Sequence, residues 1–359
     1  MAGGDVSVEP SLDGMAVASV GRTRVKPGWL IFWLAIPLLA WWSLRALEPA
    51  EIWGTLRHLG AQAILALVLL NLGILVLFAS RWWLILHALG YRRPYLSLAG
   101  YRLAGFGITY FTPGTQVGGE PLQVYLLQRR EKVPAEAAIA SVGLDKLLEL
   151  LSNFTFLLVG VITVLASGLG QGTIGSGLVA LPALLLALPF AYLAALWLGR
   201  RPASALARWL SARSPGSLRL ARIARVAPAS EDNVAHFFHQ HPGHLLLALL
   251  ASLLIWLAII LEFSMTLRFL GLRLSLAQVL LALTAARLAF LLPVPAGLGS
   301  LEAGQVLAMG LLGVNPAVGI SLSLIIRARD ILFGGVGLWL GGILSRPDQR
   351  AFIIKEIGK

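Results

Sequence analysis

The stretch PGTQVGGEPLQ, residues 113–123, interrupts a chain that is otherwise rich in Leu, Ala and Val. Proline blocks helix continuation and removes a backbone donor, while glycine permits turns and close backbone approach. Glu120 follows directly, where the positive end of a new helix would favour a carboxylate. Unpaired backbone groups cannot face hydrocarbon, so such a break must be buried in protein or line a wet cavity. The stretch predicts a helix–break–helix unit inside a membrane protein.

The composition identifies an integral membrane protein. Of the 359 residues, 57% are hydrophobic, the mean hydropathy is +0.80, and only 13% are charged, against about 25% in an ordinary soluble domain. The chain has no cysteine, which excludes disulfides and thiolate metal sites. Its net charge of +12 fits cytoplasmic loops beside anionic lipid, so we expect no nucleic-acid partner.

Six apolar runs are long enough to cross a bilayer, which takes about 20 residues. These runs are 28–46, 61–88, 135–166, 176–198, 243–270 and 316–344. Two further stretches, 96–112 and 276–292, run into Pro/Gly-rich breaks, and shorter helical stretches follow at 119–130 and 300–313. We interpret each pair as a hairpin that enters the membrane and returns on the same side. The predicted fold is an all-α integral membrane protein with about six full spans plus two re-entrant helical hairpins.

The positive charges orient this arrangement, because Lys and Arg concentrate in cytoplasmic loops. Basic clusters occur at 22–26, 92–93, 129–132, 200–225 and 346–359. If the first broken stretch crossed the membrane only once, Arg129, Arg130 and Lys132 would face outward. The hairpin interpretation avoids this and puts both termini in the cytoplasm.

The remaining segments complete the predicted organisation. Residues 1–27 are polar and irregular, and we expect a disordered cytoplasmic N-terminus. The polytopic membrane domain covers 28–346 and begins with an uncleaved signal anchor, since no convincing A-x-A cleavage site follows. Residues 347–359 form a cytoplasmic tail. The basic cytoplasmic loop 199–242 forms either amphipathic helices on the inner leaflet or a solvated loop.

An internal repeat relates two parts of the chain, about 61–166 and about 243–344. Proline and glutamate are seven residues apart in both parts, and the closing cation and acid are three apart in both. The matched residues are Arg102, Pro113, Glu120, Lys146 and Glu149 in the first part, and Arg287, Pro295, Glu302, Arg327 and Asp330 in the second. The linking span 176–198 makes the two parts lie in opposite orientations. Inverted repeats are a common plan for secondary transporters, with broken helices meeting near mid-membrane.

Charged residues inside the predicted membrane segments cost roughly 2.5–3.5 kcal/mol each at the bilayer centre, so they usually pair or face a wet interior. Lys146 and Glu149 share a helix face, as do Arg327 and Asp330. These pairs are either salt bridges that hold repeat to repeat or parts of a translocation cavity.

The other intramembrane charges allow similar alternatives. Glu120 and Glu302 lie next to the breaks, which favours a role at the cavity. Arg102 and Arg287 either face the cavity or brace the hairpins. Glu262, a lone acid late in its span, either joins the cavity or reaches the outer interface.

Several motifs resemble a known family. PGTQVGGEPLQVYLL (113–127) with DKLLELL (145–151), and PAGLGSLEAG (295–304) with RARD (327–330), resemble the flippase-like membrane domain of the lysylphosphatidylglycerol synthase family over roughly residues 28–345. SRWWLILHALG (80–90) resembles the Arg-Trp end of an early family helix, which points to Arg81 and Trp82. The family's G-x-G-x-x-E-A segment is matched by Gly297, Gly299, Glu302 and Ala303.

The resemblance implies translocation of a lipid or a lipid-linked head group. The family's acid–Arg–x–x–Asp pattern is occupied here by Asp145, Lys146 and Glu149, which keeps the charges but loses bidentate arginine geometry. Bifunctional members add a soluble acyltransferase-like domain, whereas this chain ends at Lys359, so we expect the translocating part alone. Stand-alone members are linked to hopanoids and polyprenyl-linked sugars, and the implied location is a bacterial inner membrane.

The predicted site is a polar cavity between the repeats. Its predicted residues are Arg102, Pro113, Gly118, Gly119, Glu120, Asp145, Lys146, Glu149, Arg287, Pro295, Gly297, Gly299, Glu302, Arg327 and Asp330, with Arg81, Glu262 and Arg329 in secondary positions. The histidines of HFFHQHPGH (236–244) lack zinc spacing and an acid partner, which favours a loop over a metal site. We expect no cofactor, no metal and no catalytic residue.

Three functions remain open. The first is translocation of membrane lipids that carry anionic or lipid-linked head groups. The second is a membrane-embedded transferase acting on a polyprenyl, hopanoid or phospholipid head group, with Glu120, Asp145 and Glu149 as its acids. The third is a scaffold for lipid-synthesis enzymes, against which the many cavity charges argue.

Overall fold

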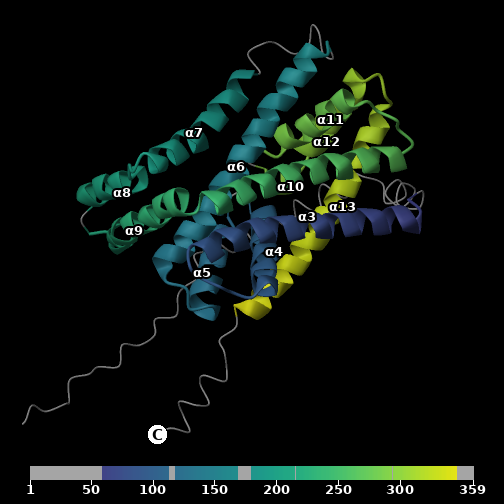
Figure 1. The fold of residues 1–359 in the computed structure, drawn as a ribbon. Coiled ribbons are helices and arrows are strands. Elements are labelled where there is room, and N and C mark those ends of the chain that lie inside the picture. Colours follow the sequence, from purple (N-terminus) through teal and green to yellow (C-terminus); the bar gives the residue numbers. More distant parts are fainter. Residues whose placement is uncertain (1–58, 113–117, 169–178, 215, 293, 346–359) are drawn as a thin grey trace, which may run out of the picture.

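A computed structural model describes residues 59–112, 118–168, 179–214, 216–292 and 294–345. The described residues form helices joined by short connections, with no strand among them (Figure 1). The helices are α3 (Ala61–Ala88), α4 (Tyr95–Phe111), α5 (Glu120–Arg130), α6 (Ala135–Ala166), α7 (Ala180–Trp197), α8 (Pro202–Arg213), α9 (Leu218–Gln240), α10 (Pro242–Phe269), α11 (Leu276–Ala289), the 3₁₀ turn η2 (Pro295–Gly297), α12 (Ser300–Leu311) and α13 (Pro316–Leu344). The predicted span 28–46, Pro113 and both terminal segments lie outside the described residues.

Four of the described helices are long and apolar enough to cross a membrane, namely α3, α6, α7 and α10. They match four of the predicted spans closely. Helix α13 has 29 residues, but its middle carries Arg327, Arg329 and Asp330. Many leucines on α3 and α10, such as Leu69 and Leu257, are exposed. An outer surface this apolar suits contact with lipid rather than with water.

Two helix–break–helix units occur where the sequence predicts them. Helix α4 ends at Phe111 and α5 begins at Glu120, while α11 ends at Ala289 and α12 begins at Ser300. The two arms of each unit contact each other. A side chain at Gly119 would overlap the carbonyl of Gly105 on α4. Glycine is therefore required there for the chain to return this close to α4.

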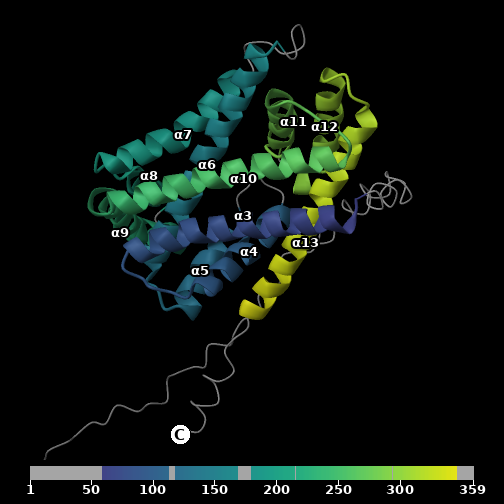
Figure 2. The same ribbon diagram turned by 45° about the vertical axis from the view of Figure 1, so that its right-hand side comes forward.

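The two predicted halves are interlocked. Helices α3 and α10 lie side by side and run in opposite directions (Figures 1 and 2). Helix α4 of the first half packs on α13 of the second, and α11 of the second half packs on α6 of the first. The backbones of α4 and α13 approach closely, because a Cβ at Gly107 would lie 2.6 Å from the carbonyl oxygen of Gly334. Small residues permit such contact between membrane helices.

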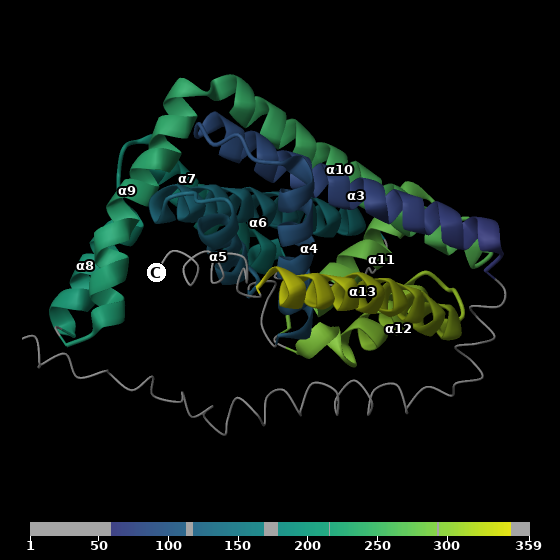
Figure 3. The ribbon, with the colours of Figure 1, turned by 90° about the horizontal axis from the view of Figure 1, so that it is seen from below.

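The basic segment 199–242 is mostly helical, forming α8 and α9 at the edge of the molecule (Figure 3). The buried carboxylate of Glu231 on α9 joins the two helices. It accepts hydrogen bonds from the backbone nitrogens of Ala203 and Ser204 at 2.8 and 3.0 Å, and from the Tyr192 hydroxyl at 3.1 Å. These contacts satisfy backbone donors in the first turn of α8.

Candidate functional site

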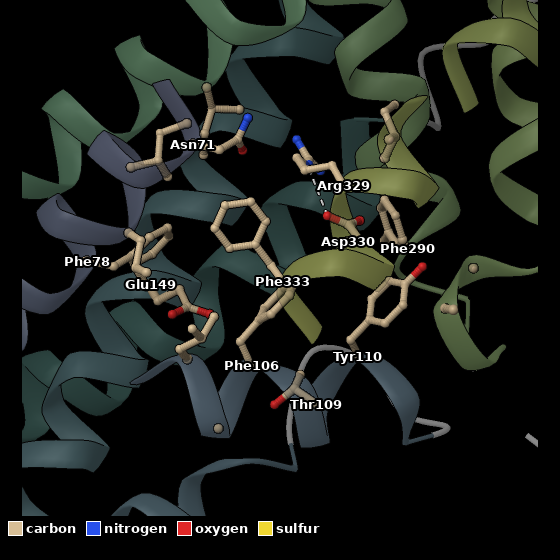
Figure 4. Close-up of a pocket in the computed structure, with 18 of the residues that line it drawn as sticks. Asn71, Phe78, Phe106, Thr109, Tyr110, Glu149, Phe290, Arg329, Asp330 and Phe333 are labelled. Atoms are coloured by element: carbon tan, nitrogen blue, oxygen red, sulfur yellow. Dashed lines mark hydrogen bonds and ion pairs between the residues drawn. The ribbon is translucent and has the colours of Figure 1, made fainter. Parts of the chain in front are cut away.

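A cavity of about 310 Å³ lies where α3, α4, α6, α10, α11 and α13 meet. Charged side chains from both halves line it, together with many aromatic and aliphatic ones. Figure 4 shows Phe106 and Phe333 between Glu149 on one side and the Arg329–Asp330 pair on the other. The volume is at the low end of the range for small-molecule sites, which is about 300–1,000 Å³.

Asp145 is the centre of the charge cluster of the first half. Arg81 of α3 is only 1% exposed and donates from Nε to Oδ1 of Asp145 at 2.7 Å. Arg102 of α4 donates to the other carboxylate oxygen of Asp145 and also to Glu149. Arg81 donates further to the Ser252 hydroxyl on α10 at 3.1 Å. The cluster thus joins four helices and leaves none of its charges alone, as burial requires.

Glu120 connects the first break to the long helix α6. Its Oε1 lies 3.1 Å from Nζ of Lys146, and its Oε2 accepts from the Gly118 backbone nitrogen at 2.7 Å. Lys146 also lies 2.8 Å from Glu149, one turn further along α6. The carboxylate therefore caps its own break and neutralises a cation on another helix.

Glu302 makes the corresponding contact in the second half. Both of its carboxylate oxygens accept from Arg327 on α13, at 2.6 and 2.7 Å. Arg327 also donates to the carbonyl oxygens of Ala296 and Gly297 in the break, at 3.4 and 3.1 Å. Its guanidinium satisfies the acceptors that the broken backbone exposes, as a buried break requires.

Arg329 forms ion pairs with the two other acids of the second half. It lies 3.0 Å from Glu262 on α10 and 2.8 Å from Asp330. Glu262 is buried as well as paired. The expected face-sharing pair of Arg327 and Asp330 is not joined, because Arg327 turns to Glu302 and Asp330 to Arg329.

Arg287 lines the cavity but forms no hydrogen bond or ion pair with any described residue. Its guanidinium lies over the ring of Trp256, 4.9 Å from the centroid. Trp256 in turn stacks on Phe156, with ring centroids 4.0 Å apart. The aromatic ring stabilises the cation, while none of its five N–H donors has an acceptor among the described residues.

The structure brings most of the predicted site residues together and leaves a few aside. Arg102, Glu120, Lys146, Glu149, Arg287, Gly297 and Asp330 line the cavity, as do Glu262 and Arg329. Arg81, Asp145, Glu302 and Arg327 join the ion pairs around it. Gly118 and Gly119 lie at the first break, Pro295 is in η2, and Gly299 is exposed.

Sequence reasoning missed two kinds of residue at the site. Tyr110 lines the cavity with a buried hydroxyl that has no partner among the described residues. Gln123 and Gln305 are both buried, each three residues after a break glutamate, and Nε2 of Gln305 donates to the Ala282 carbonyl at 2.8 Å. The shared glutamate-to-glutamine spacing in EPLQ and EAGQ was a signal that could have found the glutamines. No group of His, Asp or Glu in the described ranges is arranged to hold a metal ion.

Comparison with known proteins shows the family of the chain. The model of the lysylphosphatidylglycerol synthase TM region matches residues 28–336, which is most of the chain. The chain belongs to the lysylphosphatidylglycerol synthase transmembrane family. The chain is also similar to a protein of Methanothermobacter thermautotrophicus described as a "UPF0104 membrane protein". The two are 25% identical over 287 residues, which cover 78% of this chain and 84% of the relative. No solved structure matches the chain.

Proposed function

We propose that the protein moves a lipid, or a lipid-linked head group, between the two leaflets of a membrane through the cavity between its halves. The observation that carries this proposal is the cavity itself, whose walls combine charges from both halves with aromatic and aliphatic side chains. A lipid has the same dual character, because its polar head group needs a wet site and its tails need hydrocarbon. The head group would cross in the cavity while the tails stay in lipid.

The inverted repeat that the sequence predicts supports the proposal, because secondary transporters place their sites between such repeats. In both halves the glutamate that follows the break bonds to a cation on the long last helix, Glu120 with Lys146 and Glu302 with Arg327. The antiparallel pair α3 and α10 and the exchanged packing of α4 and α11 also fit a two-fold relation. The translocation site would then lie near the two-fold axis.

The proposed topology has six full spans and two re-entrant hairpins, in a bacterial inner membrane, with both termini in the cytoplasm. Contact between the two arms of each broken unit supports the hairpins. The absence of natural cysteine makes a direct test simple. A single cysteine at Arg129→Cys should react with an impermeant maleimide only from the cytoplasmic side. Labelling only from outside would show that the first broken unit crosses the membrane.

Translocation can be measured in proteoliposomes as the rate at which a fluorescent phospholipid leaves the inner leaflet. We expect the wild-type protein to accelerate this exchange and Glu120→Gln to slow it about tenfold, which corresponds to about 1.4 kcal/mol on the barrier. Asp232→Asn is the matched control, because this acid pairs with Arg201 at an exposed site on α9.

The same assay has two outcomes that oppose the proposal. Equal rates with and without protein, for every lipid class tested, would rule out translocation. A head group of altered mass after incubation with the protein would indicate a transferase instead.

A further inference from the structure

One cation in the cavity forms no direct ion pair with any described residue. Six cations belong to the two charge clusters, and five of them bond to acids. These are Arg81, Arg102, Lys146, Arg327 and Arg329. The sixth, Arg287, has no acidic partner in the described part of the chain, because Arg329 holds both Glu262 and Asp330. An arginine stays charged in any protein environment, and the N–H donors of this one have no acceptor among the described residues, only the ring of Trp256 beside them. The position therefore favours an anion from outside the chain.

Tyr110 supplies a second group without a partner on the same cavity. Its side chain is largely buried, with the whole residue 8% exposed, and its hydroxyl has no hydrogen-bond partner among the described residues. Figure 4 shows Tyr110 on the side of the cavity that holds Phe290 and Asp330. Phe290 follows Arg287 by three residues on the same helical segment. A buried hydroxyl without a partner loses free energy, which a ligand oxygen would restore.

We infer that Arg287 and Tyr110 form a subsite for the phosphate group of a lipid whose head group carries one net negative charge. This inference rests on the proposed function. One unpaired guanidinium neutralises one charge, and its fork of donors matches two phosphate oxygens. The tyrosine hydroxyl donates to a third oxygen. The other cavity cations are already neutralised, so a head group with more charge would find no further free cation here.

The surroundings of Arg287 favour a lipid over a free phosphate compound. Apolar side chains line the cavity beside it, among them Phe106, Phe290 and Phe333. A volume of about 310 Å³ suits a head group and the start of its tails but not two whole acyl chains. A small soluble phosphate would leave this apolar wall uncovered.

Binding to the purified full chain tests the subsite. The probe is a fluorescent phosphatidylglycerol bound to the protein in detergent, displaced by phosphatidylglycerol, by phosphatidylcholine or by sn-glycerol 1-phosphate. We expect phosphatidylglycerol to displace the probe best. Arg287→Gln should weaken phosphatidylglycerol binding about tenfold or more, as loss of a charged hydrogen bond does, and should abolish its advantage over phosphatidylcholine. Tyr110→Phe should weaken it about tenfold, as loss of a hydrogen bond to a charged group does.

Two further variants show whether charge alone is enough for binding and whether the loss is specific to Arg287. Arg287→Lys keeps the charge but loses the bidentate fork, so we expect an affinity between those of the wild type and Arg287→Gln. Arg225→Gln removes an exposed arginine of α9 and should leave binding unchanged. A single symmetrical peak in size-exclusion chromatography establishes that each variant is folded.

Several outcomes would overturn the subsite. These are unchanged phosphatidylglycerol affinity in folded Arg287→Gln, an equal loss in Arg225→Gln, or displacement by glycerol phosphate as good as by the lipid. Failure of the proposed function looks different. In that case Arg287-dependent lipid binding would persist while proteoliposomes show no translocation of any lipid.

Discussion

The two halves of the molecule carry matching charges in different states of pairing. Arg102 in the first half bonds to Asp145 and Glu149, whereas its counterpart Arg287 has no acid among the described residues. The extra acid Asp145 precedes Lys146, but the matching position before Arg327 is the apolar Ile326. The cations that line the cavity from the first half, Arg102 and Lys146, therefore have ion-pair partners, whereas Arg287 of the second half has none among the described residues.

In each half an ion pair joins the first helix to the last helix, but the charges of the two partners are exchanged between the halves. Arg81 lies nine residues before Gly90, and Glu262 lies nine residues before Gly271. Arg81 bonds to the acid Asp145 on α6, while Glu262 bonds to the cation Arg329 on α13. The first helix carries the cation of this ion pair in the first half and the acid in the second.

The largest expected effect on stability comes from disrupting the ion pairs that Arg81 and Arg102 form with Asp145 in the first half. Arg81→Gln removes a cation that is 1% exposed and leaves Asp145 with less compensation in a buried site. Loss of one partner from a buried pair costs about 3–5 kcal/mol. We expect a large fall in the thermal unfolding midpoint of the detergent-purified protein. A midpoint within the error of the wild type would show that the ion pairs around Asp145 do not stabilise the fold.

The next effect compares the two break glutamates. Glu302→Gln should destabilise the protein by about 2–3 kcal/mol, because buried Arg327 loses a bidentate carboxylate. Glu120→Gln should cost about 1 kcal/mol, since Lys146 keeps its pair with Glu149. Thermal midpoints of the two variants, measured side by side, check this order. A larger loss for Glu120→Gln would reverse the comparison.

A third effect concerns the contact between α4 and α13, where the two halves meet. Gly337→Ala places a methyl group against the carbonyl of Leu103 and should cost about 1–3 kcal/mol by overpacking. Gly335→Ala is its control two residues away, because nothing lies within 4 Å of a Cβ there. Both changes raise helix propensity equally. Equal thermal midpoints would mean that the two helices separate easily.

The smallest expected effect on stability comes from the unpaired cation. Arg287→Gln removes no ion pair within the described residues, only the contact with Trp256. We expect a change of about 1 kcal/mol or less, despite the effect on lipid binding. If Arg287→Gln lowered the thermal unfolding midpoint as much as Arg81→Gln does, Arg287 would stabilise the fold as Arg81 does. The two halves would then not differ in the way described above.

The sequence predicts the helices well because hydrophobic length and Pro/Gly breaks are local signals. The spans 61–88, 135–166 and 243–270 lie within one residue of α3, α6 and α10. Repeated spacing also placed Glu120 and Glu302 beside breaks in the chain. The choice of partner could not be read in this way, since it depends on three-dimensional distances. Arg327 has Asp330 one turn away but bonds to Glu302, and that choice leaves Asp330 to Arg329.

Tyr110 shows a second limit of sequence reasoning. Its place on α4 is not distinguished by charge, motif or spacing, and its hydroxyl is buried in the assembled fold, where its ring lies beside Gly334 of α13. A polar atom left without a partner is a property of the assembled fold. The glutamines after the breaks were visible in the sequence, but only as a weak match between two common residues.

The exchanged packing of α4 and α11 has a consequence for the origin of the chain. Under the duplication that we propose, each half packs its first short helix on the last long helix of the other half, α4 on α13 and α11 on α6. A single ancestral half would have left the glycine face of α4 uncovered. Two copies inserted in opposite directions would have covered each other. Such a pair of copies would have the geometry of an antiparallel homodimer carried on one polypeptide.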